Sequence, residues 1–245
     1  MCIRDSFMSL ENKKVVIIGG SSGIGLATAK AAVSEGASVV IASRSEEKLN
    51  SARTEIGSNC EVLPLDFTRE DSVKNFFDQS GEIDHLVTTA MTGAMGPFLE
   101  LDTATARAVF DSKFWGQYYA ARYGAPKIKA GGSITLFSGA ASQKPVPGLV
   151  AIAAVNGAVE GLCRTLAAEL SPIRVNAVSP GLVATPLYDK MPDEKRSAFF
   201  GFMADKLPVK RVGTAEDLAQ TVLYLINNGF TTGAVIDVNG GAIIV

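Results

Sequence analysis

Sulfur and imidazole ligands are scarce in this chain. It has three cysteines, Cys2, Cys60 and Cys163, and a single histidine, His85, in 245 residues. The cysteines are odd in number, far apart and not in metal-ligand spacing, which excludes a disulfide scaffold and a zinc-finger type of site. We therefore expect no metal site and a reducing, cytoplasmic location.

The chain also lacks a large excess of charge of one sign, and it lacks long apolar runs. The formal net charge is −2, so the chain has no basic field of the kind that attracts nucleic acid. Apolar runs such as Gly148 to Val155 are too short and too rich in glycine and alanine to span a bilayer. No apolar stretch follows Arg4, so the N-terminus does not have the shape of a signal peptide. We expect neither a nucleic-acid partner nor a membrane partner.

The first seven residues fit no predicted element. Met8 looks like a natural start just before the first strand. We interpret residues 1–7 as an extension or an artefact, with a disordered tail as the alternative. Residues 8–245 form the predicted domain.

Short apolar runs and segments of helical spacing alternate along the whole domain. This alternation, without a linker or repeat, predicts one α/β domain of Rossmann type: a doubly wound parallel sheet of seven strands flanked by helices. Residues 192–205 look like a mobile helical insertion. The predicted strands are 14–18, 38–42, 62–65, 83–88, 133–137, 173–178 and 234–238, and the main helices are 24–35, 46–56, 69–78, 103–129, 149–170 and 215–227.

A glycine cluster follows the first predicted strand. Gly19, Gly23 and Gly25 permit a tight turn and the close approach of a pyrophosphate to the start of a helix. The same stretch supplies Ile24 and two hydroxyl donors, Ser21 and Ser22. The alternative is a tight turn without a ligand, but the strand–turn–helix context favours a dinucleotide site.

The end of the second strand predicts which nicotinamide cofactor is bound. An acidic residue there would bind a ribose 2′-hydroxyl and repel a 2′-phosphate. This chain has Ser43 followed by Arg44, whose guanidinium suits phosphate, so we expect NADP(H) rather than NAD(H). The alternative for Arg44 is a solvated surface arginine. Asp66, after the third strand, could accept a hydrogen bond from the adenine amino group or act as a helix N-cap.

Together these motifs resemble the classical short-chain dehydrogenase/reductase family. The resemblance rests on the glycine turn and on five further segments in the same order: Leu65-Asp66, Ile83–Val87, Ser138, Arg174–Gly181, and Thr232-Gly233 with Gly240-Gly241. It implies a nicotinamide cofactor, a substrate lid over 188–205, and a homodimer or homotetramer built on the two long helices. It also implies further cofactor contacts at Phe67, Ala90, Pro180, Gly181, Val183 and Thr185.

The predicted active site departs from that family. The family carries a Ser-Tyr-Lys set in which the Tyr and Lys are four residues apart on one helix. Ser138 is kept, but Ile152 stands in place of the Tyr and Asn156 in place of the Lys. Pro145 to Leu170 contains neither Tyr nor Lys. Ile152 has no exchangeable proton, whereas Asn156 can still hydrogen-bond a ribose hydroxyl.

A lysine stands at another position of the predicted active site. Lys113 occupies the family's Asn position in the long helix, where it could restore a charge near the nicotinamide or donate a proton. The alternative is a surface lysine of an interface helix. We therefore expect an NADP(H)-dependent oxidoreductase with an atypical active site, acting on an unidentified small carbonyl or alcohol. The competing hypothesis is an inactive nucleotide-binding sensor or assembly protein of the same fold.

Overall fold

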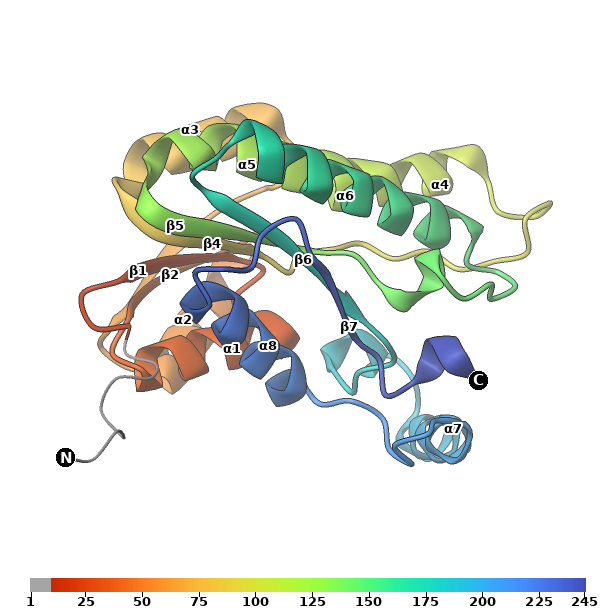
Figure 1. Cartoon of the computed structure of the whole chain (residues 1–245). Helices are drawn as coiled ribbons and strands as arrows, with labels where there is room; N and C mark the ends of the chain where they lie inside the picture. The colour runs from red at the N-terminus through yellow and green to blue at the C-terminus, as the bar shows by residue number, and fades with distance from the viewer. Residues whose placement is uncertain (1–9) are drawn as a thin grey trace.

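The computed structural model describes residues 10–245. The extension predicted for residues 1–7 lies outside this range. Seven strands form one sheet in the order β3-β2-β1-β4-β5-β6-β7, and all neighbouring strands pair in parallel. The predicted doubly wound parallel sheet is confirmed (Figure 1). Its strands are β1 (Lys14–Ile18), β2 (Ser38–Ser43), β3 (Cys60–Pro64), β4 (Ile83–Thr88), β5 (Ile128–Phe137), β6 (Arg174–Pro180) and β7 (Val235–Val238).

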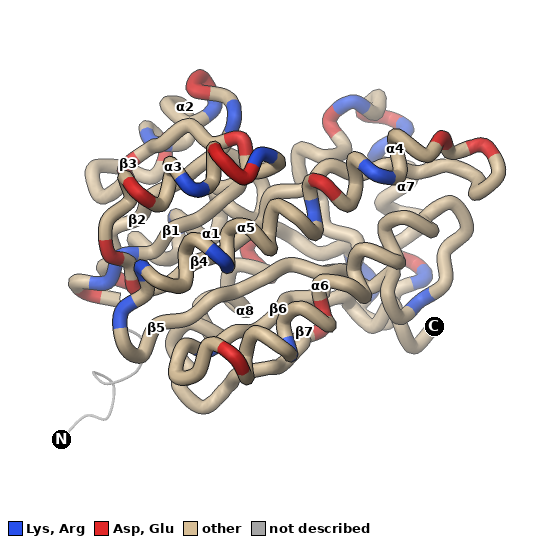
Figure 2. The backbone as a smooth tube through the Cα atoms, turned by 90° about the horizontal axis from the view of Figure 1, so that it is seen from above, with Lys and Arg blue, Asp and Glu red and all other residues tan. Residues whose placement is uncertain are grey.

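Helices cover both faces of the sheet. One layer holds α1, α2 and α8, and the other holds α3, α4, α5 and α6 (Figure 1). Charged residues gather over α2 and α3, away from the C-terminus (Figure 2). The helices are α1 (Gly23–Ser34), α2 (Glu46–Ile56), α3 (Glu70–Ser80), α4 (Thr103–Phe110), α5 (Gly116–Gly124), α6 (Val150–Glu169), α7 (Asp193–Lys206) and α8 (Ala215–Asn227).

The uninterrupted apolar character of β1 follows from this layering. Val15 and Ile17 belong to the core cluster shared with α1 and α8. Val16 and Ile18 belong to the cluster shared with α3, α5 and α6. Because both faces of the strand are covered, both sets of side chains are apolar. The sheet is therefore a rigid platform for the loops at its carboxyl edge.

The prediction of one helix over 103–129 is wrong in two respects. A π-helical turn, Asp111–Trp115, separates α4 from α5, and β5 begins at Ile128. Gly131 and Gly132, which follow the predicted helix in the sequence, lie inside β5. A Cβ on Gly132 would approach the Asp84 carbonyl oxygen to 2.2 Å, so the close passage of β5 beside β4 requires glycine there.

Among the described residues, one helix has the length and composition to cross a membrane: α6, with a mean hydropathy of 1.3. Our prediction considered only the shorter run that ends at Val155. Length and composition alone are weak evidence, because core helices meet the same criterion. Val159 and Cys163 of α6 lie fully buried in the core against the sheet, and 33% of the helix segment is buried.

Candidate active site

Loops after four neighbouring strands bring the predicted site residues to one edge of the sheet. Gly19 follows β1, Ala90 follows β4, Ser138 follows β5 and Gly181 follows β6. A Cβ on Gly19 would lie 2.6 Å from the Ala90 backbone nitrogen, so two of these loops are in direct contact. This carboxyl edge is where open α/β sheets bind ligands.

The glycine turn after β1 has the backbone that a diphosphate site needs. Gly19 has a φ of +90°, which favours glycine, and a Cβ on Gly25 would lie 2.2 Å from the Gly19 carbonyl oxygen. Ser22 precedes α1 in extended conformation, and its hydroxyl makes no capping bond. The first turn of α1 has no acidic residue, so its free N–H groups are open to an anion. A dinucleotide phosphate fits this cradle.

The residues predicted to select the cofactor lie at the end of β2. Ser43 Oγ is buried and has no hydrogen-bond partner among residues 10–245. Arg44 is exposed and, within residues 10–245, makes no hydrogen bond or ion pair. Both groups are therefore free to bind the phosphate of a ligand.

Asp66 is not the N-cap of the helix that follows it, because α3 begins at Glu70 with Arg69 as its cap. Instead, Asp66 Oδ1 accepts hydrogen bonds from the Thr68 backbone and hydroxyl at 3.1 and 2.7 Å. A four-residue spacing from the helix start is too long for a capping bond. The Phe67 side chain is packed against Gly116, so its backbone is the part left to contact a nucleotide.

The segment after β6 returns to the glycine turn. Gly181 donates its N–H to the Val238 carbonyl at 3.0 Å, and Val183 bridges to Gly213. A Cβ on Gly23 would lie 3.4 Å from Thr185. The segment that holds Pro180, Gly181, Val183 and Thr185 therefore closes over the turn that holds Gly23.

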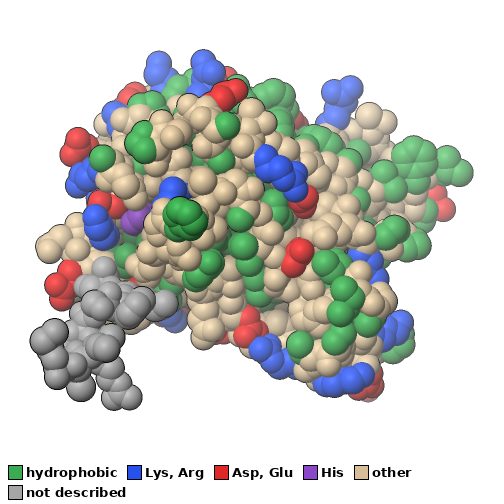
Figure 3. Space-filling view, viewed as in Figure 1, with side chains coloured by type: hydrophobic (Ala, Val, Ile, Leu, Met, Phe, Trp, Pro, Cys, Tyr) green, Lys and Arg blue, Asp and Glu red, His purple; other side chains and the backbone are tan. Residues whose placement is uncertain are grey.

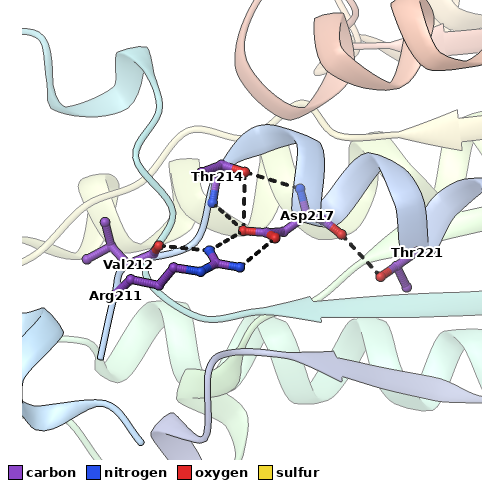
Figure 4. Close-up of polar contacts among 5 residues, drawn as sticks. All are labelled: Arg211, Val212, Thr214, Asp217 and Thr221. Carbon is purple, nitrogen blue, oxygen red and sulfur yellow. Dashed lines mark hydrogen bonds and ion pairs between the residues drawn. The ribbon is translucent and has the colours of Figure 1, made fainter. Parts of the chain in front are cut away.

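An ion pair between Arg211 and Asp217 fixes the loop that pairs with Val183 of this segment (Figure 4). Both terminal nitrogens of Arg211 donate to the Asp217 carboxylate, at 2.6 and 2.8 Å. Asp217 and Thr214 also cap the start of α8 reciprocally. The Arg211 hydrogen bonds hold the pKa of Asp217 well below its usual range. The loop so fixed carries Gly213, which pairs with the backbone on both sides of Val183.

Lys113 is buried, which overturns the surface alternative for this residue. Its side chain lies in the π-helical turn and is 4% exposed. The Nζ atom donates to the Ser138 carbonyl oxygen at 2.7 Å. Burial lowers the pKa of Lys113 to about 8, and no carboxylate within the described chain pairs with it. A π-helical turn often accompanies a functional site.

Gln117 is a site residue that our reading of the sequence missed. Its Nε2 donates to the Lys113 and Phe137 carbonyls at 2.8 and 3.0 Å. Its Oε1 accepts from the Phe137 N–H and the Thr88 hydroxyl at 2.8 and 2.7 Å. This single amide joins the π-helical turn to β4 and β5. A glutamine among aromatics in the sequence gives no signal of such a role.

Ser138 and Asn156 each present an unpaired polar atom. Ser138 Oγ and Asn156 Oδ1 are buried and have no partner among the described residues. Asn156 Nδ2 donates to the Gly139 carbonyl at 3.0 Å, which fixes the loop that carries Ser138. Buried polar atoms are normally satisfied, so these two indicate a place for ligand hydroxyl or carbonyl groups.

Ile152, one helical turn before Asn156 on α6, belongs to an apolar environment. It packs on the cluster of Val109, Ala151 and Val155, to which Ala94 and Leu101 also contribute. No proton can come from this position. The structure therefore brings Ser138, Asn156 and Lys113 together through the loop after β5.

His85 lies apart from this site, inside β4. Its Nδ1 is 2.9 Å from the Ser133 hydroxyl, and burial lowers its pKa to about 4, which keeps the ring neutral. Over residues 10–245, no group of three or more His, Cys, Asp or Glu side chains is arranged to hold a metal ion.

Comparison with known proteins gives one family. A family model described as enoyl-(acyl carrier protein) reductase matches residues 19–242. The short-chain dehydrogenase/reductase ATR9 of Stachybotrys chlorohalonatus is 34% identical, with 96% of this chain and 98% of that protein covered. A solved small-chain dehydrogenase in complex with NADPH is 39% identical, with a TM-score of 0.84 over 95% of this chain and 99% of its own.

A second solved structure is relevant to the active site. It is an NADPH-bound short-chain oxidoreductase from Pseudomonas aeruginosa PAO1 that contains an atypical catalytic center. It is 27% identical, with a TM-score of 0.90 over 96% of this chain and 98% of its own. These similarities extend over nearly the whole chain and agree with the fold and the cofactor cradle. The chain belongs to the short-chain dehydrogenase/reductase family.

Proposed function

We propose that this chain is an NADP(H)-dependent oxidoreductase that acts on a carbonyl or alcohol and uses Lys113, rather than residue 152, to handle the proton. The observation that carries this proposal is the buried Lys113 amine, 2.7 Å from the Ser138 carbonyl oxygen. Lys113 is a titratable group in contact with the loop that holds Ser138, whereas Ile152 and Asn156 offer none. The bound cofactor would supply the hydride.

Two observations support NADP(H) over NAD(H). Arg44 is exposed and free of partners within the described chain, and Ser43 Oγ is an orphaned buried hydroxyl beside it. Together they offer the cation and hydroxyl that suit a 2′-phosphate. A similar solved protein also has NADPH bound. The cradle of Gly19, Ser21, Ser22, Gly23, Ile24 and Gly25 would hold the diphosphate, and Asp66 and Phe67 would flank the adenine.

The proton chemistry follows from two groups. The Ser138 hydroxyl, which has no partner in the described part of the chain, would donate to the substrate oxygen and hold it. Lys113 uses one donor on the Ser138 carbonyl, and its pKa of about 8 leaves it with a transferable proton near neutral pH. Asn156 Oδ1 would accept a hydrogen bond from a ribose hydroxyl. Its Nδ2 group donates to the Gly139 carbonyl and so holds the loop that carries Ser138 in place. A general acid contributes roughly 10²- to 10⁴-fold to such reactions.

The exposed face of α6 supports a homodimer or homotetramer. Only 33% of this apolar helix segment is buried within the single chain. Gly157 and Gly161 on it have nothing within 4 Å of a built Cβ, so another helix could approach closely. We propose that a second copy packs there, and that the assembly works in the cytoplasm, with residues 188–205 as the lid.

NADPH oxidation with a panel of ketones and aldehydes tests the function, run beside calorimetric titration of NADPH and NADH. The proposal predicts turnover with at least one carbonyl compound and tighter binding of NADPH. NADPH binding without turnover on any member would favour the inactive binding protein. Failure to bind either cofactor would contradict both functions.

A further inference from the structure

Four segments at the carboxyl edge of the sheet are almost free of charge. These segments, 86–99, 138–150, 179–188 and 238–245, contain one charged residue, Lys144, although 20% of the whole chain is charged. The Lys144 amine donates to the Val245 carbonyl oxygen at 2.6 Å. Charged residues lie over α2 and α3 and also along α4 and α7 (Figure 2).

Large apolar side chains stand exposed on the same segments. We call Met95, Phe98, Leu99, Val146 and Ile244 the apolar rim. Met95, Phe98 and Leu99 are 74%, 71% and 93% exposed. Hydrophobic side chains gather visibly at the end of the molecule that holds the loop between β4 and α4 (Figure 3). Exposed apolar groups that gather in this way mark a binding surface.

Hydrogen bonds join the segments of the apolar rim to one another. The Gly96 N–H donates to the Gly148 carbonyl at 3.0 Å, which ties the loop after β4 to the loop after β5. The Lys144 bond to Val245 adds the C-terminal segment. The rim is therefore one continuous border rather than five scattered side chains.

The apolar rim is also continuous with the reacting groups. The Thr92 N–H donates to the hydroxyl of Ser112, the residue next to Lys113, at 3.1 Å. Ala94 and Leu101, which flank the rim residues of that loop, pack with Ile152 in one apolar cluster. An apolar surface thus leads from the rim to the position where the family has a polar tyrosine.

We infer that the substrate is a free, uncharged carbonyl compound or alcohol with a bulky apolar body, which lies between the apolar rim and the Ile152 cluster. Within these four segments a substrate bearing phosphate or carboxylate would meet a single cation, Lys144, which already has a partner. Burying an unpaired charge on this surface would cost far more than burying a hydrocarbon group gains. The reaction of this substrate by hydride transfer rests on the proposed function, whereas its binding to the apolar rim does not.

A matched pair of ketones tests it: 4-tert-butylcyclohexanone and 4-oxocyclohexanecarboxylate. Calorimetric titration into protein saturated with NADP⁺ measures the affinity for each ketone without turnover, and NADPH oxidation then measures kcat/KM. We expect the tert-butyl ketone to bind at least about tenfold more tightly and to react with the higher kcat/KM. Equal or tighter binding of the carboxylate would overturn the inference.

Rim variants locate the binding surface. Phe98→Ser and Leu99→Ser should each weaken binding of the tert-butyl ketone about 3- to 30-fold and leave NADPH affinity unchanged. Phe230→Ser is the control, because Phe230 is fully exposed on the segment between α8 and β7. This segment lies at the amino ends of the strands, away from the candidate site. If the rim variants instead reduce the mass seen by light scattering without changing ketone affinity, the rim contacts a second copy and the inference is wrong.

Failure of the substrate inference and failure of the proposed function give different results. Preferential binding of the tert-butyl ketone without any turnover would support the inference and count against the proposed function. Turnover of both ketones with preference for the carboxylate would support the function and refute the inference.

Discussion

The Lys113 amine donates to the Ser138 carbonyl oxygen at 2.7 Å, across the gap between the π-helical turn and the loop after β5. This contact places a buried lysine beside the one polar residue kept from the family's Ser-Tyr-Lys set. It is the structural basis for the relocated proton group that we propose.

Lys113 should make stability depend on pH. Burial lowers its pKa from the usual 10.5 to about 8 in the folded protein, so between these values the unfolded chain binds more protons. The free energy of unfolding should therefore rise as pH increases from about 8 to about 10.5. Lys113→Met should remove this rise and increase the free energy of unfolding at pH 7 by about 1–3 kcal/mol, measured by urea denaturation. An unchanged pH profile in the variant would show that Lys113 is not the group responsible.

Arg44 should select the phosphorylated cofactor. Arg44→Ala should weaken NADPH binding by about 1–3 kcal/mol, the scale of a charged hydrogen bond, and leave NADH binding nearly unchanged. Calorimetric titration of both cofactors checks this. Arg53→Ala, on the last turn of α2, is a control that should affect neither. Equal losses for NADPH and NADH on Arg44→Ala would contradict the assignment.

Gln117 should contribute strongly to stability through its four hydrogen bonds. Gln117→Leu keeps the volume but leaves partners on β4, β5 and the π-helical turn unsatisfied, at a cost of about 3–5 kcal/mol in urea denaturation. Gln143→Leu removes one exposed bond to Asp237 and should cost less than about 1 kcal/mol. Similar losses in the two variants would argue against a network centred on Gln117.

Restoring the family pair should raise activity. In the Lys113→Met protein, Ile152→Tyr with Asn156→Lys supplies the phenol and the cation that α6 lacks, so NADPH-dependent ketone reduction should increase by up to about 10²-fold for a well-placed acid. The change requires that Ser138 stays in place, although Asn156→Lys removes the Gly139 contact. Asn156→Lys alone is the control and should not accelerate the reaction. No gain in the folded double variant would indicate that Ser138 and the cofactor cradle are out of register.

The alternation of elements was enough to predict the sheet, because short apolar runs bounded by turn residues alternate regularly with longer segments of helical spacing. The predictions for β1, β4, α2 and α8 match the structure residue for residue. The π-helical turn between α4 and α5 could not be predicted, since it differs from an α-helix only in the spacing of its backbone hydrogen bonds, five residues instead of four, and leaves no composition signal. Gly131 and Gly132 follow the predicted helix, yet both lie in β5, where Gly132 passes close to the Asp84 carbonyl and Gly131 has a φ of +82°.

The candidate site could be predicted only in part. Glycines and the Ser43-Arg44 pair carry their chemistry in local sequence, so the cofactor cradle was accessible from the chain alone. The burial of Lys113 and the network of Gln117 depend on packing between segments about 20 residues apart or more. Local sequence carries no record of such contacts, and the alternative of a surface lysine was open until the structure was known.

The most direct measurement compares NADPH oxidation by the unaltered protein and by Lys113→Met, with 4-tert-butylcyclohexanone as substrate and NADPH affinity measured on both by calorimetry. If Lys113 handles the proton, kcat should be at least about 10²-fold lower in Lys113→Met, with NADPH affinity unchanged. Equal kcat in the two proteins, at equal NADPH affinity, would contradict it.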